Sequence, residues 1–92
     1  MATAQWKLLI SGRVQGVSYR AWTAQQARVA RIRGYVRNLD DGRVEAVIEG
    51  EPDMLRALVD VCYEGPPAAR VEYIEVDEDS CEGPFNTFDI MS

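Results

Sequence analysis

Residues 10–20 read ISGRVQGVSYR and place two glycines between a run of apolar residues and a stretch of helix-forming residues. Glycine adopts backbone angles that other residues avoid, so a loop with Gly12 and Gly16 can turn successive N–H groups inward. The first N–H groups of the following helix lack intrahelical partners and carry the positive end of its dipole. Arg20 adds a planar guanidinium that can bind two oxygens of one phosphoryl group. The segment therefore predicts a site for phosphate or carboxylate.

Apolar periodicity and the positions of glycine and proline predict the secondary structure of the rest of the chain. The expected order is βαββαβ with a short extra strand at the C-terminal end. This order is typical of the α+β, ferredoxin-like sandwich, in which two helices pack on one face of a mostly antiparallel sheet. The expected strands are 6–13, 35–39, 44–48, 70–77 and 85–91. The first helix is expected over residues 20–31, and the second after Asp53 and before Gly65.

Four local features carry more specific expectations. The unbroken apolar run 8–10 suits an interior strand that is buried on both faces. Gly34 is expected to end the first helix, and the DDG sequence at 40–42 to form the turn of the hairpin between the second and third strands. Asp53 is placed to cap the second helix, whose apolar residues recur at three- and four-residue spacing before Gly65 ends it.

Composition limits the class of protein. The chain has 92 residues, of which 47% are hydrophobic, and we expect one domain over residues 1–92. No apolar run approaches the roughly 20 residues of a membrane-spanning helix. The N-terminal MATAQWKLLI lacks the long apolar region and cleavage site of a signal peptide, so we interpret it as the first strand. We expect a cytoplasmic monomer without a membrane partner.

Charge is distributed unevenly along the chain. Residues 1–43 hold eight Lys or Arg and two acidic residues, whereas residues 44–92 hold two basic and thirteen acidic residues. Basic charge thus accompanies the glycine loop, as an anionic substrate would require, although solvated helix and strand faces also explain it. The net charge of −5 and the isoelectric point near 4.6 oppose nucleic acid as a partner.

The cysteines indicate a reducing compartment and no metal site. Cys62 and Cys81 stand alone, and the chain contains no histidine, so it lacks the ligands of a zinc site. We expect Cys62 to be a small buried hydrophobic residue and Cys81 a loop residue, both reduced, while a disulfide between them stays open. No metal and no cofactor is expected.

Comparison with familiar phosphate chemistries narrows the reaction. A cysteine-dependent phosphatase needs Arg six positions after its Cys, where this chain has Ala68 and Thr87. A nucleotide-binding loop needs its own lysine, but the only lysine is Lys7, outside the loop. Phosphate held by backbone and Arg20, without an evident nucleophile, base or metal, leaves water to attack a substrate with a good leaving group. An acyl phosphate qualifies, because its carboxylate leaving group has a pKa of about 4.

Two segments, ISGRVQGVSYR and GYVRNLDDGRVEAVIEG, resemble the signature segments of the acylphosphatases, and the similarity continues through GPPAARVEYIEV and the closing FDI. The resemblance implies metal-independent hydrolysis of the carboxyl–phosphate bond of small acyl phosphates, with inorganic phosphate as product and competitive inhibitor. It implies that Asn38 orients the attacking water through its side-chain amide. It assigns phosphate binding to the loop formed by Gln15, Gly16, Val17, Ser18, Tyr19 and Arg20.

The chain departs from the usual family pattern at two places. Tyr19 stands where phenylalanine is more usual, and the sequence ARI at 30–32 replaces the common LGL, so Arg31 is expected to hold a left-handed backbone. Trp22 and Tyr35 are expected to be core or rim aromatics that do not bind a ligand.

Two other functions stay open from the sequence alone. One is an anion-binding or regulatory domain that keeps the loop without turnover, and the other is a nucleic-acid module with outward-facing aromatic residues. Outside the matched segments, Arg20 would be an exposed arginine at a helix start and Asn38 an ordinary turn residue.

Overall fold

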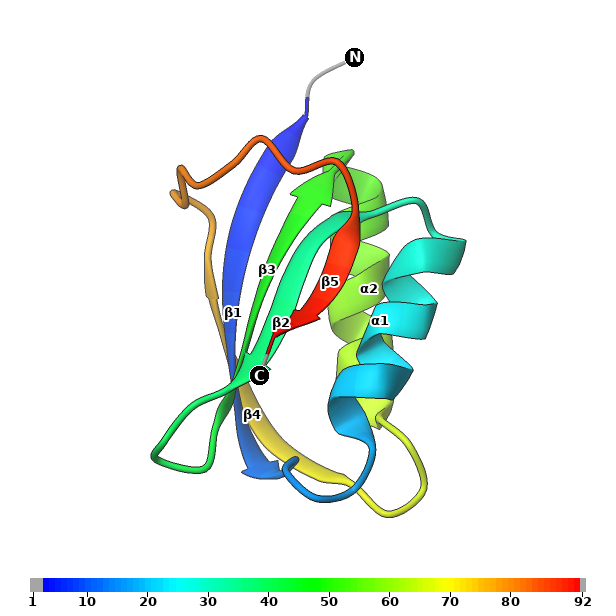
Figure 1. Ribbon diagram of the computed structural model, residues 1–92, viewed down its shortest axis with the longest axis vertical. Coiled ribbons are helices and arrows are strands. Elements are labelled where there is room, and N and C mark those ends of the chain that lie inside the picture. Colours follow the sequence, from blue (N-terminus) through cyan, green and yellow to red (C-terminus); the bar gives the residue numbers. More distant parts are fainter. Residues whose placement is uncertain (1–2, 92) are drawn as a thin grey trace.

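The computed structural model describes residues 3–91 and confirms the ferredoxin-like plan, with both helices on one face of the sheet (Figure 1). The five strands are ordered β4-β1-β3-β2-β5, and every neighbouring pair is antiparallel except β2 and β5. The elements are β1 (Ala4–Arg13), α1 (Tyr19–Val29), β2 (Arg33–Asn38), β3 (Val44–Gly50), α2 (Pro52–Glu64), β4 (Arg70–Asp77) and β5 (Phe88–Met91).

The hydrophobic core lies between the sheet and the two helices. Alternate residues of each strand point into it, and α2 contributes side chains at the spacing that the sequence predicts. α1 is different, because the residues that it buries against the sheet are mostly small, which lets its backbone lie close to the strands. Fully buried side chains include Leu8, Ile10, Val36, Val44, Ile48 and Leu55 from the strands and α2, and Thr23, Ala24 and Ala27 from α1.

β1 is an interior strand, as predicted, but it is not buried on both faces. Lys7 and Leu9 point away from the helices and are only half-buried. The segment between β4 and β5 crosses part of this outer face (Figure 1), where the side chain of Gln5 donates to the carbonyl oxygen of Glu82. A loop covers less of a sheet than a helix does, and half-burial of this face is the result.

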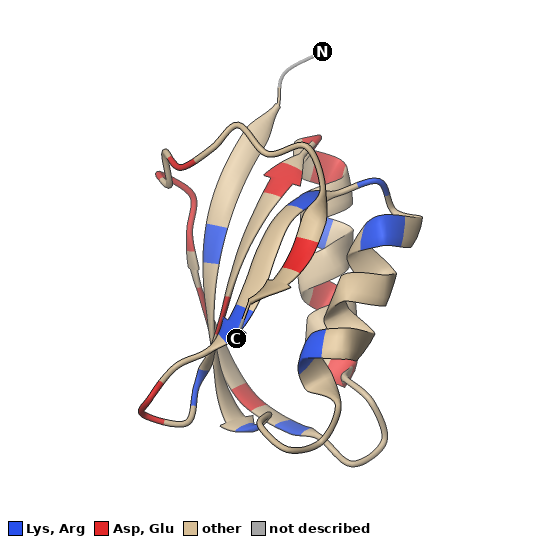
Figure 2. Cartoon of the chain, viewed as in Figure 1, with Lys and Arg blue, Asp and Glu red and all other residues tan. Residues whose placement is uncertain are grey.

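β3 is the strand that is buried on both faces. Its outer face carries Glu45 and Glu49, which are only 6% and 7% exposed. Arg37 donates from Nε to Glu45 at 2.7 Å, and the Tyr35 hydroxyl donates to the same oxygen at 3.1 Å. Burial alone would raise the pKa of Glu45, but the hydrogen bond and charge of Arg37, with smaller contributions from Tyr35 and Lys7, together hold the pKa below its usual value. Figure 2 shows basic residues of β2 beside acidic residues of β3, so folding interleaves the two halves of the sequence.

The prediction that Gly34 ends the first helix is wrong. α1 ends at Val29, and the left-handed backbone expected at Arg31 is present, with a φ of 59°. Gly34 lies inside β2 with a φ of 137°, where a Cβ atom would stand 1.8 Å from the carbonyl oxygen of Val47. Gly34 is therefore needed for the close approach of β2 to β3.

The second helix begins before Asp53, so the predicted cap is also wrong. Glu51 is the N-cap residue, and Pro52 opens α2, where its missing N–H has no consequence. Asp53 lies in the first turn and accepts from Arg56 at 3.0 Å. Gly65 ends the helix as predicted, with a φ of 66°.

The last strand is shorter than predicted. β5 begins at Phe88, because the chain before it turns across the outer face of the sheet. Phe85 packs edge-on against Tyr35, with ring centroids 5.9 Å apart, and its N–H donates to Glu49. The apolar residues that predicted a strand from Phe85 therefore belong to two different features. Phe85 makes this contact with Tyr35, and only the residues from Phe88 onward form the strand.

Replacing Gly34 with alanine should lower the free energy of unfolding by about 2 kcal/mol or more, because the Cβ atom would overlap the carbonyl of Val47. Gly42→Ala is the matched control: Gly42 has a φ of 96° but no atom within 4 Å of its Cβ position, so only the backbone is strained. The Gly42→Ala substitution should lower the free energy of unfolding by about 1 kcal/mol. Urea denaturation followed by circular dichroism measures both, and equal losses would contradict the close-approach explanation.

Candidate active site

The loop between β1 and α1 has the left-handed backbone that an anion-binding loop needs. Gly16 has a φ of 72° and Ser18 a φ of 64°. Ser18 is the N-cap residue of α1, but its side chain makes no capping hydrogen bond. The N–H groups of the first turn of α1 therefore have no side-chain cap, and they lie at the positive end of the helix dipole, which favours anions.

A pocket of about 200 Å³ opens beside this loop and brings Arg20 and Asn38 together. Arg20 comes from the first turn of α1, and Asn38 is the last residue of β2. Gly16, Ser18 and Tyr19 of the predicted loop also line the pocket. The lining residues that the sequence analysis missed are Val14, Ala21 and Ile90. Val14 and Ala21 flank the predicted loop directly, whereas Ile90 comes from β5, which the loop motif does not mark.

Arg20 is fixed by the last strand. Its Nη1 atom donates to the carbonyl oxygen of Met91 at 2.8 Å. Arg28, two turns along α1, donates from Nε and Nη2 to the carbonyl oxygen of Phe88 at 3.1 and 2.8 Å. α1 thus holds both ends of β5, and a guanidinium has five N–H donors, so the bond to Met91 leaves others free to meet an anion.

Asn38 presents an unpaired polar atom. Its Oδ1 atom is buried and has no hydrogen-bond partner within residues 3–91. A buried acceptor without a donor costs about 1–3 kcal/mol, and native structures contain few of them. Locally unfavourable positions of this kind are common at functional sites.

Two residues of the predicted loop direct their side chains elsewhere. Val17 is only 9% exposed and belongs to the hydrophobic core. Gln15 donates from Nε2 to the carbonyl oxygens of Leu39 and Arg43, in the turn between β2 and β3. Any contact of these two residues with an anion would therefore come from their backbone.

The Tyr19 hydroxyl joins the two helices. It donates to the carbonyl oxygen of Cys62 at 2.8 Å, one of the last carbonyls of α2, which lack an intrahelical partner. Burial raises the pKa of Tyr19 far above its usual value, so the hydroxyl stays a donor. Burial also raises the pKa of the Cys62 thiol to about 12, which keeps it protonated and unreactive. Both cysteines are free, Cys62 buried and Cys81 exposed, as expected.

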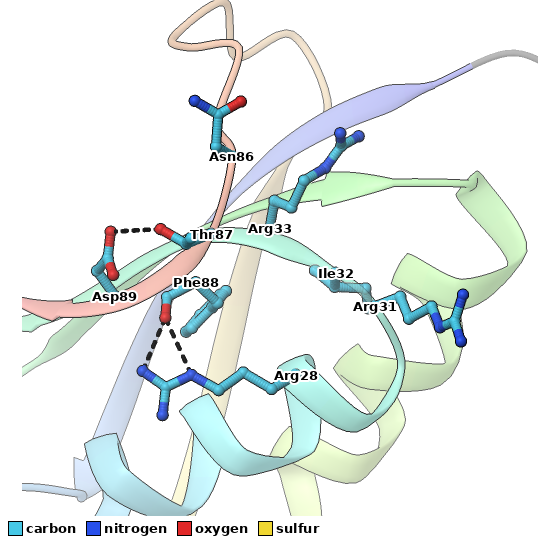
Figure 3. Close-up of a pocket in the computed structure, with 8 residues that line it drawn as sticks. All are labelled: Arg28, Arg31, Ile32, Arg33, Asn86, Thr87, Phe88 and Asp89. Carbon is cyan, nitrogen blue, oxygen red and sulfur yellow. Dashed lines mark hydrogen bonds between the residues drawn. The ribbon is translucent and has the colours of Figure 1, made fainter.

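A second hollow, of about 510 Å³, lies at the other end of α1 and does not contain the predicted site residues. It is lined by Arg28, Arg31 and Arg33, but Figure 3 shows their guanidinium groups pointing in different directions. Arg28 is bonded to the carbonyl of Phe88, and Arg33 forms an ion pair with Glu49 at 3.6 Å. The three cations therefore do not converge on one anion.

The part of the chain that the structure describes brings together no group of three or more Asp, Glu or Cys side chains suited to a metal ion. Neither helix between residues 3 and 91 combines the length and the apolar character needed to cross a membrane.

The fold and the pocket define a small α+β domain with a pocket at the start of its first helix. The acylphosphatase family model matches residues 6–90. The acylphosphatases of Chloroflexus aurantiacus and Marinobacter nauticus are each 50% identical, over 91% and 96% of both chains. The crystal structure of acylphosphatase from Bacillus subtilis, 33% identical, gives a TM-score of 0.92 over 99% of this chain and 100% of that one. The chain belongs to the acylphosphatase family, whose members hydrolyse acyl phosphates.

Tyr19→Phe should lower the free energy of unfolding by about 1–2 kcal/mol, because the carbonyl of Cys62 would lose its donor inside the protein. Tyr73→Phe is the matched control, since Tyr73 is 59% exposed and should change stability little. Thermal or urea denaturation measures both variants. A Tyr19→Phe protein as stable as the native chain would show that water replaces the hydroxyl.

Proposed function

We propose that Arg20 and the loop from Gln15 to Tyr19 bind the phosphoryl group of a small acyl phosphate and that Asn38 orients the water that attacks it. The observation that carries this proposal is the shared pocket, to which α1 contributes Arg20 and β2 contributes Asn38. The products are a carboxylate and inorganic phosphate, and inorganic phosphate would compete with substrate for the same donors.

Charge stabilisation is the role of the loop, the helix start and Arg20. In phosphoryl transfer, negative charge spreads over the equatorial oxygens of the transferred group, and fixed donors stabilise it. The uncapped N–H groups of α1 and the guanidinium supply such donors from two directions. The bond to Met91 fixes the guanidinium before substrate binds, so little reorganisation is needed.

Asn38 positions water without acting as a base. Its amide oxygen can accept a hydrogen bond from water while its nitrogen donates one to a phosphoryl oxygen, which aligns the water for in-line attack. The Oδ1 atom is buried without a partner in the described residues, so a water that enters beside it with the substrate would give it a donor. The proton of the attacking water passes to the phosphoryl group itself, so an acyl phosphate dianion and water give a carboxylate and dihydrogen phosphate.

The reaction needs neither a metal nor a cofactor. A carboxylate leaves with a pKa of about 4 and requires no proton from a general acid. One chain supplies every element of the pocket, so we propose that the protein acts as a monomer. The two free cysteines favour a cytoplasmic location.

Arg20→Ala should lose affinity for phosphate as well as rate, because the planar pair of donors is gone. Arg20→Lys should restore little of either, since an ammonium cannot reproduce the geometry of the fork. Competitive inhibition by inorganic phosphate during benzoyl phosphate hydrolysis measures the affinity. Near-normal inhibition of Arg20→Ala would remove Arg20 from the phosphate site.

Asn38→Ala should reduce kcat on the order of a hundredfold or more while phosphate still binds, because one oriented group of the transition state is lost. The assay is benzoyl phosphate hydrolysis in excess chelator, with the native chain, Arg20→Ala and Asn38→Ala each confirmed to be folded. Turnover by the native chain alone supports both roles and metal independence. If the native chain binds phosphate but hydrolyses nothing, the loop is an anion receptor instead.

A further inference from the structure

Gln15 makes the one direct side-chain link between the β1–α1 loop and the β2–β3 turn that the structure records within residues 3–91. Its Nε2 atom donates to the carbonyl oxygen of Leu39 at 2.8 Å and to that of Arg43 at 2.9 Å. An amide nitrogen has two N–H donors, so both are used, and the two carbonyls fix which end of the amide faces the turn. The same turn is closed by the N–H of Leu39, which donates to Arg43 at 2.8 Å.

This link joins the two sides of the pocket. Gly16, the residue after Gln15, lines one side, and Asn38, the residue before Leu39, lines the other. The Asn38 side-chain oxygen has no partner of its own in the described residues. The place of the Asn38 amide therefore depends on the backbone at the end of β2, and Gln15 ties that backbone to the loop.

We propose that Gln15 is a positioning residue that sets the distance between the bound phosphoryl group and Asn38. The proposal rests on the function assigned to Asn38 above. Gln15 does not line the pocket, and it acts through the carbonyl groups of Leu39 and Arg43. In-line attack is sensitive to such spacing, since a displacement of about 1 Å can cost roughly 100-fold in rate.

The phosphate side of the pocket has separate support. Arg20 is held by Met91, and the first turn of α1 is fixed by the packing of the helix on the sheet. Removing the link from Gln15 should therefore shift Asn38 relative to the phosphate, while most donors to the phosphate stay in place. The expected signature is a fall in kcat without a loss of phosphate affinity.

Gln15→Met and Gln15→Glu test the proposal. Methionine keeps the length of the side chain but has no donor, and glutamate sets a carboxylate oxygen against two carbonyls. Both should lower kcat for benzoyl phosphate roughly 10- to 100-fold, and Gln15→Met, which adds no charge, should leave the inhibition constant of inorganic phosphate unchanged. Gln25→Met, at an exposed position of α1, is the matched control and should keep the native kcat. An unchanged kcat in Gln15→Met, or parallel losses of kcat and phosphate affinity, would overturn the proposal.

A double-variant cycle separates positioning from general stability. If Gln15 acts through Asn38, the variant with both Gln15→Met and Asn38→Ala should have the same kcat as Asn38→Ala alone. Two losses that multiply would mean that Gln15 acts independently of Asn38, and the proposal would fail.

A measurement without turnover distinguishes failure of this proposal from failure of the proposed function. Titration with inorganic phosphate, followed by nuclear magnetic resonance, should shift the Arg20 side-chain signal in the native chain and in Gln15→Met. The Asn38 side-chain amide should shift in the native chain and much less in Gln15→Met. Equal shifts of the Asn38 amide in both proteins would overturn the positioning role, whatever the native chain hydrolyses.

Discussion

The closeness of α1 to the sheet is the constraint on which the pocket depends. Beyond Tyr19 in its first turn, α1 buries Thr23, Ala24 and Ala27, each 0% exposed, and side chains of this small size let the helix backbone lie near β2. Because alternate residues of a strand share a face, Asn38 points to the helix side of the sheet like Val36. The first turn of α1 and the end of β2 therefore meet across one small pocket, and larger residues on the helix face would separate them.

The edge strand β5 adds a second constraint, because the arginine that lines the pocket also helps to hold this strand in place. A four-residue edge strand has little area of its own, and two arginines of α1 bind its carbonyl groups at either end. Arg20 is one of the two, so a cation that lines the pocket is also part of the structure that holds the strand. Binding to Met91 orders a flexible side chain in advance, which favours electrostatic stabilisation of a transition state over mere attraction of a substrate.

The sequence predicted the order of the elements from local periodicity and glycine placement. It also named Arg20 and Asn38 from two long matched segments; the structure brings both to one pocket, and their roles stay predictions. It misplaced Gly34, since a glycine just after a helix has the same local signature whether it ends the helix or admits a neighbouring strand. The carbonyl of Val47 decides between them, and no local rule names it. The link made by Gln15 was missed for the same reason. Its acceptors are backbone carbonyls of a distant turn, and every residue has a backbone carbonyl, so the residue types there do not indicate the contact.

The groups that line the pocket do not alternate between protonated and deprotonated forms. Its described lining contains no carboxylate or thiol, the chain has no histidine, and the Tyr19 hydroxyl is committed to Cys62. An acyl phosphate tolerates such a site because its leaving group needs no proton, so orientation and charge have to supply most of the rate. Orientation in turn requires groups held where local energetics do not favour them: a left-handed Ser18 and a buried, unpaired oxygen on Asn38. The surrounding core stabilises these positions, and in this respect the fold is part of the mechanism.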